Sequence, residues 1–74
     1  MSNICEEKME LPAEHERNVF GQFDEHAKLI EKTLGVTLIS RDGQLKILGP
    51  QIACNQAVKI LKEFLELSKR GNTI

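Results

Sequence analysis

The sequence predicts an α+β domain in which a three-stranded antiparallel sheet carries two or three helices on one face. Three observations predict it: alternating polar and apolar residues near the N-terminus, Asp42-Gly43 between two β-rich runs, and a long helical stripe in the last third. The elements read β-α-α-β-β-α in chain order, which suits a sheet covered on one side. With 74 residues, 41% of them hydrophobic, the chain has enough apolar material for one small core.

The first strand and a short helical segment are expected in the N-terminal quarter. Residues 1–3 are expected to be a disordered start, and residues 4–70 a single domain. Residues 4–11 alternate in the manner of a half-buried strand, which Pro12 ends. Residues 13–20 can form a short helical turn that directs Val19 and Phe20 inward, before Gly21 breaks it.

The second helix is expected from Asp24 to Leu34. Asp24 is a suitable N-cap, because its carboxylate can accept hydrogen bonds from the N–H groups of the first turn. Gly35 is suited to the left-handed conformation that ends many helices. The residues predicted to face the core are Phe23, Ala27, Ile30 and Leu34, with Glu25, Lys28, Glu31 and Lys32 outside.

A β-hairpin is expected next, with Asp42-Gly43 in a type I′ turn that requires positive φ at both residues. Alternation directs one set of side chains to the helices: Val36, Leu38, Leu45 and Ile47. Ile39 and Leu48 then lie on the opposite face of the sheet. Because exposed apolar residues on a sheet indicate a covering partner, this pair is a candidate interaction surface.

The last helix is the clearest periodic segment. Pro50 can occupy its first position, and Gly71 ends it. Its predicted buried stripe is Ala53, Ala57, Ile60, Leu61, Phe64, Leu65 and Ser68. Residues 71–74 are expected to be a C-terminal linker stub.

The net charge of −1 predicts no general attraction to polyanions. Three Phe are present and no Tyr or Trp, so the chain has few side chains that could stack on nucleic-acid bases. The charge is nevertheless uneven. Residues 1–31 carry three basic and eight acidic residues, whereas residues 32–74 carry seven basic and three acidic ones. Either one basic face or ordinary solvated surfaces would fit this distribution.

No set of residues suggests catalysis or a metal site. Cys5 and Cys54 form no CxxC pair, and the two histidines, His15 and His26, are far from them in sequence. Both histidines are expected at the surface, with packing of His26 over the preceding loop as the alternative. No GxSxG or GxxxxGK[ST] sequence is present, so this chain is not expected to be an enzyme or to hold a cofactor.

The absence of targeting signals in this sequence favours a cytoplasmic protein. No apolar run approaches the roughly 18–20 residues that span a bilayer, and no signal sequence follows Met1. Two free thiols fit a reducing compartment.

One family resemblance covers most of the chain. The segments "VFGQFDEHAKLIEKTLGVTLI" and "LKILGPQIACNQAVKIL" resemble a KH domain in order and spacing. More closely, "NVFGQFDEHAKLIEKTLGVTLISRDGQLKILG" resembles the N-terminal domain of PhoH-like proteins, over about residues 8–71. These are bacterial, phosphate-starvation-inducible ATPases in which a P-loop domain follows a small KH-like module. The resemblance implies an accessory domain of an RNA-associated protein, with ATP and Mg²⁺ bound by a P-loop domain outside this sequence.

The resemblance also assigns a nucleic-acid site. In KH domains a GxxG turn clamps the nucleic-acid backbone beside a groove between the second helix and second strand. By position, the turn is Gly21, Gln22, Phe23 and Asp24, and the candidate groove residues are Lys28, Lys32, Arg41 and Lys46.

Asp24 stands where KH domains have the second glycine of the GxxG turn. Its Cβ and its carboxylate at the helix N-terminus are expected to exclude a phosphate. We therefore expect this chain alone to bind single-stranded RNA weakly or not at all. The alternative is a protein-interaction or oligomerisation module that docks onto the ATPase domain or other subunits through Ile39 and Leu48.

Overall fold

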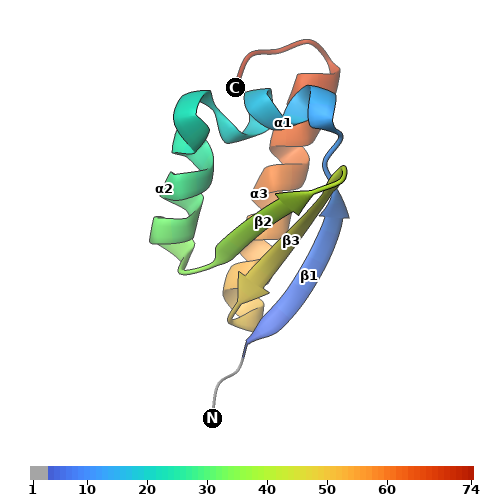
Figure 1. Cartoon of the computed structure of the whole chain (residues 1–74). Coiled ribbons are helices and arrows are strands. Elements are labelled where there is room, and N and C mark those ends of the chain that lie inside the picture. Colours follow the sequence, from blue (N-terminus) through green and yellow to red (C-terminus); the bar gives the residue numbers. More distant parts are fainter. Residues whose placement is uncertain (1–3) are drawn as a thin grey trace.

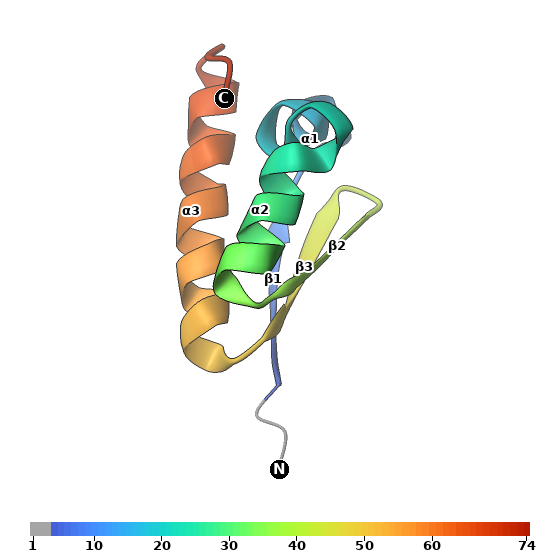
Figure 2. The same cartoon turned by 90° about the vertical axis from the view of Figure 1, so that its left-hand side faces the viewer.

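A computed structural model describes residues 4–74, and the predicted disordered start at residues 1–3 lies outside the described residues. The predicted α+β class and the β-α-α-β-β-α order are confirmed (Figure 1). Figure 2 shows α2 and α3 on the same side of the sheet. The elements are β1 (Cys5–Glu10), α1 (Ala13–Phe20), the 3-10 turn η1 (Gln22–Asp24), α2 (Glu25–Leu34), β2 (Thr37–Arg41), β3 (Gln44–Gly49) and α3 (Gln51–Lys69).

The sheet is antiparallel, with strand order β1-β3-β2. Its two faces follow from strand alternation: in β3, Leu45 and Ile47 are buried against the helices, and Lys46 between them faces away. The register aligns Lys8, Lys46 and Ile39 in one row across this open face of the sheet. The helices therefore leave one face of the sheet uncovered.

The predicted β2–β3 turn is confirmed. Asp42 has φ 53° and Gly43 has φ 77°, the two positive values of a type I′ turn. The carbonyl of Gly43 accepts a hydrogen bond of 2.9 Å from the N–H of Leu11, which holds the end of β1 to the hairpin. Gly35, with φ 72°, ends α2 as predicted.

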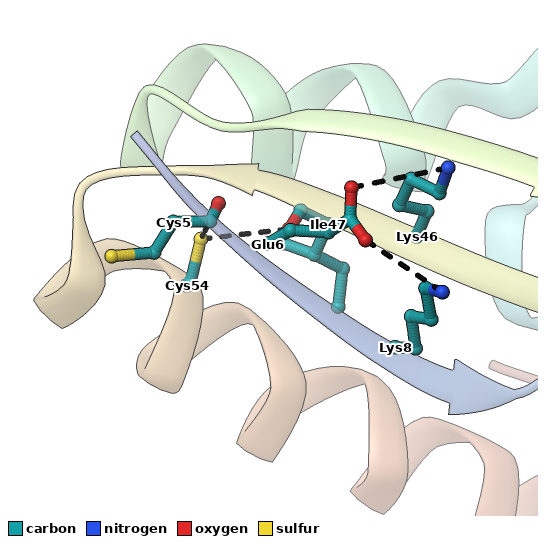
Figure 3. A network of polar contacts seen from close by, with 6 residues as sticks. All are labelled: Cys5, Glu6, Lys8, Lys46, Ile47 and Cys54. Atoms are coloured by element: carbon teal, nitrogen blue, oxygen red, sulfur yellow. Dashed lines mark hydrogen bonds and ion pairs between the residues drawn. The ribbon is translucent and has the colours of Figure 1, made fainter. Parts of the chain in front are cut away.

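The core lies between the sheet and α3. Its largest fully buried side chains are Leu11, Val19, Leu45, Ile47, Cys54 and Leu61. Cys54, absent from the predicted stripe of α3, lies with its Sγ 3.4 Å from the carbonyl oxygen of Gly49. Figure 3 shows its contact with the carbonyl oxygen of Cys5, at 3.6 Å. Burial, followed by the nearby Cys5 and Glu7, raises the pKa of the Cys54 thiol, so it stays protonated at neutral pH.

Residues after α3 turn back towards α1. The carbonyl of Asn72 and the N–H of Ile74 both hydrogen-bond the side chain of Asn18. The segment predicted as a linker stub therefore lies against the domain over residues 72–74 (Figure 1).

Candidate nucleic-acid interface at the Gly21 turn

The four-residue turn Gly21–Asp24 joins α1 to α2, as the sequence predicts. Its backbone is unusual, because Gly21 (φ 81°), Phe23 (φ 57°) and Asp24 (φ 57°) all have positive φ. The N–H of Asp24 donates to the carbonyl of Gly21 at 3.1 Å, which closes the turn. Left-handed backbone at two successive residues other than glycine is uncommon and is concentrated at functional sites.

Gly21 is required here by its neighbour as well as by its φ. A Cβ on Gly21 would lie 2.7 Å from Nδ1 of His26. The His26 ring is held by an Nδ1 contact of 3.3 Å to the Val19 carbonyl and by edge-on packing against Phe64, at 6.1 Å between ring centroids. His26 thus packs over the turn, the alternative placement considered for it in the sequence.

The middle of the turn faces solvent. Gln22 and Phe23 are both exposed. Successive N–H groups in a turn with left-handed residues can form a concavity that binds an anion, so the turn has the kind of backbone that can contact a phosphate oxygen.

The predicted side-chain cap by Asp24 is wrong. Asp24 precedes α2 in the N-cap position, but its carboxylate makes no capping hydrogen bond. A capping residue needs an extended backbone to direct its side chain at the first-turn N–H groups, whereas Asp24 has φ 57° and ψ 28°. The negative charge of Asp24 remains at the helix N-terminus, without the hydrogen bonds that were expected to fill the anion position.

The predicted burial of Phe23 is also wrong, since its side chain is 84% exposed. The left-handed backbone at Phe23 and Asp24 breaks the helical period on which the prediction depended. The adjoining core is instead filled by Val19 and Phe20, both buried.

We expect Phe23→Asn to raise the free energy of unfolding by about 1 kcal/mol. Asparagine tolerates the left-handed region, which costs a bulky L-residue roughly 1–2 kcal/mol, and little apolar burial is lost. Urea unfolding followed by circular dichroism measures the difference. Phe20→Asn is the control, because Phe20 is buried and its loss should destabilise the domain. Destabilisation by Phe23→Asn would show that the exposed ring contributes to the fold.

The four predicted groove residues are not brought together. Lys28 and Lys32 are exposed on α2, whereas Arg41 and Lys46 lie on the open face of the sheet, away from the helices. Nζ of Lys46 lies 3.9 Å from one carboxylate oxygen of Glu6, and Nζ of Lys8 lies 3.7 Å from the other (Figure 3). The predicted basic groove is therefore divided between two surfaces.

Two carboxylates instead reach β2 from the helices, and sequence reasoning missed both. Glu31 of α2, predicted to face outward, accepts a hydrogen bond of 2.9 Å from the N–H of Leu38. Glu16 of α1 accepts a hydrogen bond from the hydroxyl of Ser40. The signal that could have indicated Glu31 is the row of unpaired N–H groups on an edge strand, which needs acceptors. The two carboxylates place negative charge between α2 and β2, where the resemblance places the groove that binds the nucleic acid.

Ile39 and Leu48 do lie on the same open face. Thr37 pairs with Leu48 and Ile39 with Lys46, so the two apolar side chains are diagonal neighbours. Ile39 is 43% exposed and Leu48 is half-buried. Beside Ile39, an open hollow at the hairpin end is lined by Glu10, Pro12, Arg41, Asp42, Gly43, Gln44 and Lys46.

Residues 4–74 contain neither a metal-binding cluster nor a membrane-spanning helix. Within that range no three His, Cys, Asp or Glu side chains gather where they could hold a metal ion. In the same range no helix has the length and apolar character needed to cross a membrane.

The other histidine, His15, contacts α3. Its Nδ1 lies 2.9 Å from Oγ of Ser68, which gives this ring a hydrogen-bonding partner.

No protein-family model matches the chain, and no curated protein matches it at a significant level.

Proposed function

We propose that this chain is the N-terminal accessory module of a PhoH-like, RNA-associated ATP-binding protein of the bacterial cytoplasm. The observation that carries the proposal is the exposed Gly21 turn, which joins α1 to α2 before the β2–β3 hairpin and has positive φ at Gly21, Phe23 and Asp24. The residues quoted for the family resemblance occupy these same elements. ATP and Mg²⁺ belong to the P-loop domain of such a protein, and the chain described here has no catalytic role.

Weak RNA binding by the isolated chain is part of this proposal. The carboxylates of Asp24 and Glu25 lie at the turn, and Glu16 and Glu31 lie at β2. Each repels a phosphate at 4 Å by about 1 kcal/mol in water and about 4 kcal/mol near a protein surface. The basic side chains that would offset this repulsion are divided between α2 and the open face of the sheet.

Fluorescence anisotropy with a labelled single-stranded RNA at low salt tests the binding. We expect a dissociation constant of about 1 mM or weaker, which corresponds to about 4 kcal/mol. Lys28→Ala with Lys32→Ala should abolish the residual binding, whereas Lys59→Ala with Lys62→Ala on α3 is the matched control. Micromolar affinity, or equal losses in both pairs, would contradict this assignment of the site.

The family assignment has its own test, which is the reading frame past Ile74. We expect a GxxxxGK[ST] sequence after a predicted strand. A gene without that sequence would overturn the PhoH-like assignment. RNA binding by the chain would still be tested by the anisotropy titration.

A second candidate function is docking to a protein through the open face. The observation that favours it is the adjacency of Ile39 and Leu48 on a sheet face that no helix covers. The partner implied by the resemblance is the ATPase domain or another subunit.

Ile39→Lys with Leu48→Lys should leave the domain folded and abolish assembly of the full-length protein, because both positions lie on the open face. Ile52→Lys is the matched control, since Ile52 is 74% exposed on α3. Circular dichroism reports folding, and light scattering after size exclusion reports assembly. Unchanged assembly in the double variant would exclude this surface.

A further inference from the structure

The last residues of the chain are tied to α1 by one side chain. Both ends of the Asn18 amide are used: Nδ2 donates to the carbonyl of Asn72 at 2.8 Å, and Oδ1 accepts from the N–H of Ile74 at 3.2 Å. We name residues 72–74 the C-terminal strap. Figure 1 shows the strap returning from the end of α3 to α1.

The reversal that directs the strap to Asn18 is itself hydrogen-bonded. Gly71 has φ 87°, and the N–H of Asn72 donates to the carbonyl of Leu67 at 3.0 Å. Asn18 is fixed by a further bond of 2.9 Å from Nδ2 to Oγ of Ser68, which is buried. The strap is therefore attached at both Asn72 and Ile74.

The strap and the Gly21 turn line the same hollow. Its lining includes Thr73 and Ile74 of the strap and Gly21, Gln22 and His26 at the turn. Arg17 also lines this hollow and can contact a phosphate there, beside the carboxylates of Glu14 and Glu25. A nucleic-acid backbone that approached the turn from this side would meet the strap.

We propose that the C-terminal strap is an autoinhibitory cover that competes with single-stranded RNA for the hollow beside the Gly21 turn. The inference rests on the proposed RNA-associated function. The bond from Asn18 to Asn72 is exposed to solvent, so the strap can open without unfolding the domain. If the strap is closed in about nine of ten molecules, it weakens RNA binding about tenfold.

Asn18→Ala tests the proposal, because it removes both attachments of the strap and retains α1. We expect faster hydrogen exchange at the Ile74 amide by NMR and about tenfold tighter RNA binding by anisotropy. Ser68→Ala is the control, since it removes the Ser68 contacts of Asn18 and His15 but leaves both strap bonds. Ser68→Ala should change neither readout.

The outcomes distinguish a failure of the autoinhibition proposal from a failure of the proposed RNA-associated function. Unchanged exchange at Ile74 in Asn18→Ala would show that Asn18 does not hold the strap, and faster exchange without tighter binding would show that the strap does not inhibit. To measure affinity in a binding-competent background, both changes are repeated with Asp24→Gly. RNA binding that appears with Asp24→Gly but is unaffected by Asn18→Ala overturns autoinhibition alone. No binding in any variant overturns the proposed function, and autoinhibition with it.

Discussion

Gly21→Ala is expected to lower the free energy of unfolding by about 3 kcal/mol, because two separate costs combine. The first cost is conformational: φ 81° with ψ 174° is a region that glycine alone occupies readily. The second is steric, since the new Cβ would lie 2.7 Å from the His26 ring. A 74-residue domain has a stability of roughly 4–11 kcal/mol, so this loss is a large part of the total. Urea unfolding followed by circular dichroism measures it.

Gly35→Ala is the matched control for the conformational cost. Gly35 has φ 72°, and a Cβ there meets no atom within 4 Å, so we expect a cost of about 1 kcal/mol. The His26→Ala background isolates the steric cost, because the clashing ring is then absent. If Gly21→Ala costs the same with and without His26, the packing of His26 over the turn does not contribute.

Asp24→Gly is expected to tighten binding of single-stranded RNA by about tenfold, which corresponds to about 1.4 kcal/mol of relieved repulsion. Removing the side chain takes away the carboxylate charge at the N-terminus of α2. It also lets a phosphate approach the backbone of the turn more closely, because Gln22 and Phe23 are exposed. Anisotropy titration of the wild type and the variant, at the same salt concentration, measures the change.

The same substitution should not destabilise the fold. Asp24 has φ 57° and makes no capping hydrogen bond, so glycine loses no such bond there and accepts the conformation without strain. Asp24→Asn is the matched control, because it removes the charge and keeps the Cβ. Equal gains for the two variants would assign the effect to charge, whereas a gain with glycine alone would assign it to access. No gain with either would exclude Asp24 as the residue that blocks the turn.

Local chemistry made much of the fold predictable. Asp42-Gly43 fixes a type I′ hairpin, and Gly35 ends α2, because both signals depend on backbone conformation within a few residues. The strand alternation likewise located the two faces of the sheet. It placed Ile39 and Leu48 together, and this pair was predicted from alternation alone.

The candidate site was less predictable because its features depend on tertiary context. The left-handed backbone at Phe23 and Asp24 breaks the helical period, which reversed the expected burial of Phe23. The contacts of Glu16 and Glu31 with β2 join residues distant in sequence or on different elements, and periodicity carries no information about them. Lys46 is different, since its alternation with Leu45 and Ile47 already placed it on the open face, and only the family resemblance had assigned it to the groove.

The central claim is that acidic side chains at the Gly21 turn and at β2 oppose RNA binding by this domain. Its most direct test is one anisotropy titration with single-stranded RNA, comparing the wild type with the combined variant Asp24→Gly, Glu16→Gln and Glu31→Gln. Glutamine preserves a carbonyl acceptor for Ser40 and for the N–H of Leu38, so the fold should persist. We predict millimolar or weaker binding by the wild type, and binding by the variant that is at least about tenfold tighter and weakens with salt. Equally weak binding by both proteins would contradict the claim.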